Sequence, residues 1–244
     1  MWTWFYKLAS PPHVFRVAAA FVPWLLGLAA LALGYGLIDG LAIAPLDYQQ
    51  GDAFRMIYVH VPSALLSLTI YTVMAAASAV ALIWRIKVGH AVAAASAPIG
   101  ASFTLAALVT GSLWGRPMWG TYWAWDPRLT SELILLFLYV GVMSLRSAFE
   151  DPARGDRAAA LLAVVGVVNV PIVHFSVVWW NSLHQGATVV RLGAPKMPGS
   201  MLWPLLAMWL GFMLFYGAVL CMRLQGELLN RERLALWVRE AIKS

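Results

Sequence analysis

Four tryptophans and a tyrosine lie within residues 114–130, a short segment between two apolar stretches. Indole rings are wide and rigid, and they combine an apolar body with a polar N–H group. A cluster of them can therefore form a flat wall for a large planar aromatic ligand, and a porphyrin is such a ligand. We predict that this segment supports a haem through Trp114, Trp119, Trp123 and Trp125.

Two histidines are placed where they can bind the iron of that haem. His60 follows the start of one apolar segment and His184 follows the end of another, both on the side of the predicted topology that carries the tryptophans. For His60 alone, a buried imidazole satisfied by a hydroxyl or carbonyl group is the alternative. As a pair, the two imidazoles can occupy both axial positions of one haem iron. We predict that His60 and His184 are these axial ligands.

Charged residues near the tryptophans each have two candidate roles. Asp126 precedes a proline, so it can cap the following helix, and it can also contact the haem. Arg128 can pair with Glu132 one helical turn later or bind a haem propionate, whereas Arg55 has no acidic partner four residues away. We expect Asp126, Arg128 and Arg55 at the haem site, with Arg116 as a further candidate for a propionate.

The other three histidines are predicted to have other roles. His13 and His90 lie in basic flanking segments, so we expect solvated side chains. His174 lies three residues after Pro171, which leaves one backbone carbonyl without its usual N–H partner. We predict that His174 or Ser176 satisfies this carbonyl, although His174 can also line a route across the membrane.

A polar stripe runs along one face of the segment that carries His60. Its members follow one another at helical spacing and are Met56, His60, Ser63, Ser67 and Tyr71. A stripe of this kind on an otherwise apolar helix is predicted to face protein and not lipid.

The composition excludes a soluble globular domain. Hydrophobic residues make up 61% of the 244 residues and charged residues 11%, whereas soluble domains carry about 25% charged residues. Segments apolar and long enough to cross about 30 Å of hydrocarbon lie near residues 18–38, 57–84, 91–113, 129–145, 159–180 and 201–222. We predict one all-α integral-membrane domain over residues 1–244, with six transmembrane helices.

The basic residues predict the orientation of this bundle. Twelve of the 17 Lys and Arg residues fall on the side that carries both termini, so the positive-inside rule places both termini in the cytoplasm. Residues 39–56, 114–128 and 181–200 then form outward loops, and residues 224–244 form a cytoplasmic amphipathic tail. The net charge of +6 is explained by this topology and by anionic lipid, so no nucleic acid is expected as a partner.

The absence of several motifs narrows the chemistry further. Cys221 is the only cysteine, which excludes internal disulfides and a Cys-x-x-Cys-His motif for covalent haem attachment. Any haem is therefore expected to be haem b, held non-covalently. The sequence lacks a Gly-x-x-x-x-Gly-Lys-Ser/Thr loop, so ATP-driven steps require a partner. No small-residue cleavage site follows the first apolar segment, which is expected to be retained.

Residues 119–130, WGTYWAWDPRLT, with His60 and His184 on either side, closely resemble the tryptophan-rich (WWD) haem-handling family, and in particular the C component of bacterial cytochrome c maturation. The resemblance covers essentially the whole chain. It implies a protein without turnover chemistry that binds haem at the periplasmic face of the bacterial inner membrane. It also implies delivery of the haem to a periplasmic haem chaperone, which binds it covalently through a histidine of its own. The other implied partners are a two-subunit ATP-binding-cassette transporter, a small single-span membrane protein and membrane lipid.

Two other functions are compatible with a pair of haem-binding histidines. A cytochrome b-like subunit would pass electrons through a bis-histidine haem, but such haems usually lie at membrane depth and His60 and His184 lie at helix ends. A haem transporter would carry the haem through the bundle, with His174 as an intermediate site. Transfer of the bound haem to a soluble partner would separate delivery from electron transfer.

Overall fold

The structure is a computed structural model that describes residues 9–185 and 197–243. Within these residues the regular elements are helices, which confirms the predicted all-α fold. In chain order they are α2 (Pro11–Ile38), the π-helix η1 (Asp39–Ile43), the 3₁₀-helix η2 (Asp52–Met56), α3 (Ile57–Trp84), α4 (Lys87–Trp119), α5 (Pro127–Ser147), α6 (Pro152–Gly166), α7 (Asn169–Trp179), α8 (Gly199–Arg231) and α9 (Leu236–Lys243).

Six helical segments of the described chain are long and apolar enough to cross a membrane, as the sequence predicted. Their ends extend beyond the predicted apolar stretches, because the helices continue into the residues that flank the hydrocarbon. The third segment ends at Trp119 and the sixth at Arg231. The fourth has 21 residues, which is long enough to cross about 30 Å of hydrocarbon. The chain is a multi-pass membrane protein.

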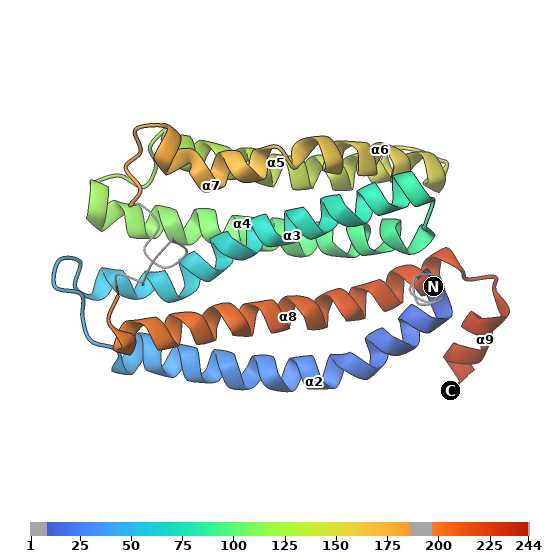
Figure 1. Cartoon of the computed structure of the whole chain (residues 1–244), viewed down its shortest axis with the longest axis horizontal. Coiled ribbons are helices and arrows are strands. Elements are labelled where there is room, and N and C mark those ends of the chain that lie inside the picture. The colour runs from blue at the N-terminus through green and yellow to red at the C-terminus, as the bar shows by residue number, and fades with distance from the viewer. Residues whose placement is uncertain (1–8, 186–196, 244) are drawn as a thin grey trace.

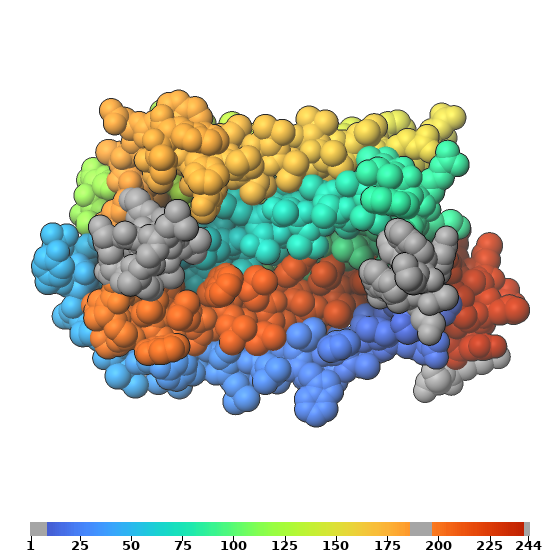
Figure 2. All heavy atoms as spheres, in the orientation of Figure 1, coloured from blue at the N-terminus to red at the C-terminus, as the bar shows by residue number. Residues whose placement is uncertain are grey.

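The helices pack in three tiers (Figure 1). α5 lies with α6 and α7 in one tier, α3 and α4 form the central tier, and α2 pairs with α8 in the third. Along α2, large apolar side chains such as Phe21, Trp24 and Leu31 are exposed, and Figure 2 shows α2 side chains projecting from the edge of the molecule. Such a face is expected against lipid, because lipid tails are as apolar as these side chains.

The polar stripe on α3 faces the protein interior, as predicted. Ser63, Ser67 and Tyr71 are all buried. The Tyr139 hydroxyl of α5 donates to the Ser67 carbonyl at 2.7 Å, and a Cβ at Gly100 of α4 would overlap the Tyr139 ring. These close contacts join α3, α4 and α5 along the centre of the bundle.

The fifth span is interrupted between α6 and α7, which changes the expected role of Pro171. Because α7 begins at Asn169, Pro171 lies in its first turn, where a missing N–H causes no loss. The carbonyl of Val167, four residues before the proline, accepts the Val170 N–H at 3.0 Å. The prediction that His174 or Ser176 satisfies this carbonyl is therefore wrong.

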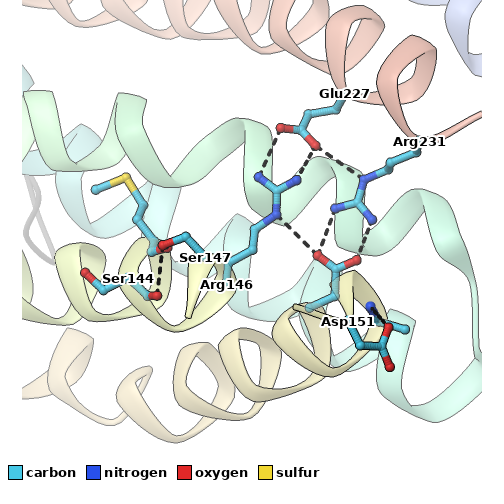
Figure 3. Close-up of polar contacts among 9 residues, drawn as sticks. Ser144, Arg146, Ser147, Asp151, Glu227 and Arg231 are labelled. Carbon is cyan, nitrogen blue, oxygen red and sulfur yellow. Dashed lines mark hydrogen bonds and ion pairs between the residues drawn. The ribbon is translucent and has the colours of Figure 1, made fainter. Parts of the chain in front are cut away.

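A ring of four charged side chains joins α5, α6 and α8 near the ends of these helices (Figure 3). Arg146 donates to both carboxylate oxygens of Glu227, at 3.1 and 2.6 Å, and to Asp156 at 3.3 Å. Arg231 donates to both oxygens of Asp156 and to Glu227. The residues that flank the turn between α5 and α6 therefore also hold α8 in place.

The C-terminal residues differ in part from the amphipathic tail predicted over residues 224–244. α8 continues to Arg231, and only α9 forms a separate short helix. The Trp237 ring of α9 packs against Phe15 of α2 at a centroid distance of 5.6 Å, and Val238 is buried. This part of the tail therefore packs on the protein.

Candidate functional site

The predicted haem residues gather at one end of the bundle, at the left in Figure 1. The α4–α5 loop and the segment after α7 lie there, whereas α2 begins and α9 ends at the opposite end. Four parts of the chain contribute: the start of α3, the end of α4, the start of α5 and residues 180–185. Segments that are far apart in the sequence therefore meet in one place.

His60 is held firmly against α4. Its Nδ1 atom lies 3.0 Å from the Ala107 carbonyl and 3.1 Å from the Thr110 hydroxyl. The Thr110 hydroxyl donates to the Ala106 carbonyl, so it can accept from His60, and a carbonyl can only accept. Nδ1 therefore carries the proton in the neutral ring, and Nε2 keeps a free lone pair. A lone pair of this kind is what an iron ion requires from an imidazole.

Gly111 allows His60 to approach α4 so closely. A Cβ at this position would lie 2.8 Å from Cε1 of His60, which is closer than side chains tolerate. One turn later, a Cβ at Gly115 would lie 2.9 Å from the Trp119 ring. The two glycines therefore clear one face of α4 for the rings of His60 and Trp119.

His184 lies five residues beyond the end of α7, which ends at Trp179. The His184 N–H donates to the Ser182 hydroxyl at 3.1 Å, but the buried Nδ1 atom has no hydrogen-bond partner. Burial and, to a smaller extent, the nearby Arg128 and His60 lower the pKa of His184 to about 4, although Asp126 opposes them. His184 is therefore neutral at pH 7.

Asp126 joins the start of α5 to the segment that carries His184. Its carboxylate accepts the Arg128 N–H at 2.8 Å, so the predicted N-cap is confirmed. It also accepts the Leu183 N–H at 2.7 Å and the Ser182 hydroxyl at 3.1 Å, and it lies 3.9 Å from Nδ1 of His184. Burial raises the pKa of Asp126, but these hydrogen bonds outweigh it and hold the pKa below its ordinary value. A charged carboxylate thus lies behind His184.

Trp114 and Trp119 are helical residues, although the sequence predicted a loop from residue 114. α4 continues to Trp119, and the loop begins at Gly120, whose φ of 76° is favourable for glycine. The Trp114 ring meets His60 edge-on at a centroid distance of 5.7 Å, and Trp119 contacts His184 at 5.0 Å. Each histidine therefore has one tryptophan of α4 beside it.

Trp123 and Trp125 lie in the loop proper and contact each other edge-to-face at 5.6 Å. Trp125 is 78% exposed, whereas Trp123 is partly buried. Hydrogen bonds within the loop, such as the one from the Thr121 hydroxyl to the Trp123 carbonyl at 2.9 Å, fix the local backbone. Among the described residues, the ring contacts of Trp123 and Trp125 are with each other, and the two rings do not line the cavity between the histidines.

The two arginines predicted to bind propionates have different environments. Each of the three guanidinium nitrogens of Arg55 donates a hydrogen bond within the protein. The acceptors are Asp52 and the carbonyls of Gly40 and Ala44 at the end of η1. Arg55 therefore caps that helix end. Arg128 lies at the site, and its guanidinium donates to the carbonyls of Val173 and His174 at 3.4 Å.

The alternative ion pair between Arg128 and Glu132 does not form among the described residues. Glu132 is buried and accepts a hydrogen bond from the Ser67 hydroxyl at 2.7 Å instead. The other arginine candidate, Arg116, stacks over Tyr122 at 5.5 Å and donates to the Gly120 carbonyl. Of the arginines considered, Arg128 is the one that lines the cavity between the histidines.

A small cavity of about 30 Å³, partly open to its surroundings, lies between the two histidines. Its lining residues are His60, Ala64, Ala107, Leu108, Gly111, Ser112, Arg128, Leu129, Glu132 and His184. The ring centroids of His60 and His184 are 6.5 Å apart, with 34° between their planes. Two imidazoles on opposite sides of one metal ion have centroids about 6 Å apart, because metal–nitrogen bonds are about 2 Å long. The spacing of the two rings and the free lone pair of His60 fit a shared iron.

The other histidines do not line this cavity. His174 lies on α7, where its ring meets Phe175 edge-on at 4.7 Å. His13 and His90 are partly buried near the opposite end of the bundle, so they are less solvated than predicted. The structure therefore brings together His60, His184, Trp114, Trp119, Asp126 and Arg128, but not Arg55.

Sequence reasoning did not identify four residues that shape the site. Thr110 and Gly111 position His60, Ser182 supports His184, and Gln50 accepts the Trp114 N–H at 3.0 Å. The spacing of Gly111 and Gly115 by one helical turn in an apolar segment was an available signal, because paired glycines often mark close approach. The other three residues, Thr110, Ser182 and Gln50, have no local signature.

Comparison with known proteins identifies one family. The family model described as "Heme exporter protein C" matches residues 4–239. Proteins named "Heme exporter protein C" from Escherichia coli strain K12 and from Haemophilus influenzae are each 47% identical, over 99% and 98% of this chain and 98% and 97% of their own lengths. The relative of that name from Bradyrhizobium diazoefficiens is 47% identical over 96% of this chain and 89% of its own length.

Proposed function

Because the chain belongs to the heme exporter protein C family, we propose that it binds haem b non-covalently and delivers it to a periplasmic haem chaperone during cytochrome c maturation. In this proposal the end of the bundle that carries His60 and His184 faces the periplasm, and both termini lie in the cytoplasm of a bacterial cell. The protein acts by binding and release, without turnover chemistry of its own. A two-subunit ATP-binding-cassette transporter and a small single-span membrane protein are its proposed membrane partners.

One observation carries this proposal: the 6.5 Å separation of the His60 and His184 rings across a single cavity. Separate contacts hold the two rings at this cavity. The Ala107 carbonyl of α4 holds His60, and the hydrogen bond from the Leu183 N–H to Asp126 holds the segment that carries His184. In our proposal the two imidazoles bind the haem iron and Arg128 pairs with a propionate. Trp114 and Trp119 contact the rings, while Trp123 and Trp125 provide the aromatic surface over which the haem edge meets its acceptor.

The position of the site also favours delivery over electron transfer. His184 lies outside the spanning helices, and Trp125, which precedes Asp126 in the chain, is highly exposed. A haem held there has one edge near the surface, where a soluble protein can reach it.

The decisive test is the visible absorption spectrum of the purified protein loaded with haem, for the wild type and for His60→Ala and His184→Ala. A low-spin spectrum in the wild type, lost or converted to high-spin in both variants, is expected. His174→Ala is the matched control, because this histidine contacts Phe175 and does not line the cavity. A low-spin spectrum that survives in both site variants would overturn the ligand assignment.

Transfer is tested separately with the same preparations. Mixing the loaded protein with an apo haem chaperone should move haem to the chaperone. Retention of all haem by the membrane protein would contradict delivery and favour the electron-transfer function.

A further inference from the structure

We infer that the two histidines have unequal roles: His60 keeps the haem, and His184 is the ligand that is released when the haem is handed on. This inference rests on the proposed function, because it assigns the order of events at the same site. It follows from a difference between the supports of the two imidazoles.

His60 cannot move without disturbing the bundle. Its ring is anchored at Nδ1 by the Ala107 carbonyl and the Thr110 hydroxyl, and it lies against the backbone of Gly111. It belongs to α3, whose neighbouring residues Tyr58 and Pro62 are buried. Displacing this ring requires the loss of two hydrogen bonds and a change in helix packing.

His184 has no comparable anchor on its ring. Its Nδ1 atom is buried without a hydrogen bond and remains 3.9 Å from the Asp126 carboxylate. The segment is held by backbone contacts, namely the Leu183 N–H to Asp126 and the His184 N–H to Ser182. It lies five residues beyond the end of α7, so it can swing away without unwinding a helix.

The difference also affects the strength of each iron bond. A hydrogen bond from Nδ1–H to an acceptor fixes the tautomer of a ligating histidine and makes its other nitrogen more basic. His60 has this support and His184 lacks it at hydrogen-bonding distance. If His184 were released, His60 would still hold the haem, and the place of His184 would be free for a ligand from the acceptor.

The test measures haem loss from the full-length protein in detergent to excess apomyoglobin, for the wild type, His60→Gly and His184→Gly. His60→Gly should lose haem at least about tenfold faster than His184→Gly, which corresponds to about 1.4 kcal/mol. His184→Gly should retain high-spin haem and return to a low-spin spectrum when imidazole is added. Equal rates of loss, or faster loss from His184→Gly, would overturn the inference.

A second pair of variants keeps the inference testable if His60→Gly does not fold. In the His184→Gly background, Thr110→Val removes one anchor of the remaining ligand. Thr104→Val is its matched control, because Thr104 also lies on α4 and also donates to the carbonyl four residues earlier. Thr110→Val should speed haem loss by about threefold to tenfold, as expected for one hydrogen bond, and Thr104→Val should not. Identical rates in the two variants would contradict a fixed His60.

The failure of this inference is distinguishable from failure of the proposed function. If the wild type binds haem through both histidines but the two variants lose haem equally, only the asymmetry is wrong. If the wild type takes up no haem at all, the proposed function itself is wrong.

Discussion

The carboxylate of Asp126 accepts a hydrogen bond from the N–H of Leu183 at 2.7 Å, across 57 positions of the sequence. This contact ties the first residue before α5 to the neighbour of His184. The same carboxylate caps α5, so one side chain sets both the helix start and the position of the ligand segment. The two roles of Asp126, capping α5 and positioning His184, can be separated by experiment, because Asp151 caps α6 in the same way.

Replacement of Asp126 by alanine should weaken haem binding by about tenfold or more, as found for groups that support metal ligands. Asp151→Ala is the matched control, since Asp151 also precedes a proline and caps α6 through the Ala153 N–H at 2.9 Å. Both variants should lose about 1 kcal/mol of helix-capping stability. Haem titration of the two purified proteins measures the difference, and equal haem affinities would show that Asp126 acts only as a cap.

Substitution of Gly111 by alanine should displace His60 and impair haem binding. The added Cβ would lie 2.8 Å from the imidazole, and overpacking of this kind costs about 1–3 kcal/mol. Gly34→Ala on α2 is the control, because nothing lies within 4 Å of a Cβ there. Haem occupancy should fall in the first variant and remain unchanged in the second. Normal occupancy in Gly111→Ala would mean that His60 does not need its close contact with α4.

Haem loading should be insensitive to pH from about 8 down to about 5. The pKa of His184 is about 4, below the 6.5 of a free imidazole, so protons do not compete with iron over this range. The groups that act on this ring are Arg128 and His60, which disfavour its protonation, and Asp126, which favours it. Below pH 6.5 the unfolded segment binds the proton more readily than the folded one. The local structure around His184 therefore loses stability as the pH falls from 6.5 towards 4, and it is at full stability above 6.5.

The measurement is a haem titration at a series of pH values, with Asp126→Asn for comparison. Removal of the negative charge should lower the pKa of His184 further and leave the flat profile unchanged. A loss of binding in the wild type with a midpoint near 6.5 would show that the imidazole is solvated and not buried.

Trp119 and Trp125 should differ in their effects on haem retention. Trp119 contacts His184, whereas Trp125 is 78% exposed and contacts Trp123. An aromatic contact contributes about 0.5–1.5 kcal/mol, so Trp119→Ala should lose haem several times faster. Trp125→Ala should retain its haem and transfer it more slowly to a chaperone. Similar retention in both variants would contradict this division of roles.

The ring of charges in Figure 3 should contribute to stability and not to haem binding. Asp156→Asn breaks its contacts with both Arg146 and Arg231, and a partly buried network of this kind is worth about 2 kcal/mol, between the values for exposed and buried pairs. The thermal unfolding midpoint in detergent should fall. Arg154→Gln is the control, because its pair with Asp151 is largely exposed. An unchanged midpoint in Asp156→Asn, or a lowered haem affinity, would contradict this assignment.

Local features of the chain were predictable from the sequence. The six spans follow from apolar length, because a backbone in hydrocarbon must satisfy its own hydrogen bonds and therefore forms helices. The Asp126 cap follows from an Asp-Pro pair at a helix start. The polar face of α3 follows from the helical spacing of Ser63, Ser67 and Tyr71.

Only the tertiary structure decided which of these groups meet. The distance between His60 and His184 depends on how α3, α4, α5 and the segment after α7 pack together, and no local pattern encodes it. The same packing places the guanidinium of Arg55 at the end of η1, where it donates to backbone carbonyls, and places Arg128 beside the cavity. It also leaves Nδ1 of His60 anchored and Nδ1 of His184 free. Helix formation is determined by nearby residues, whereas the partner of a side chain is determined by whatever the folded chain brings within hydrogen-bonding distance.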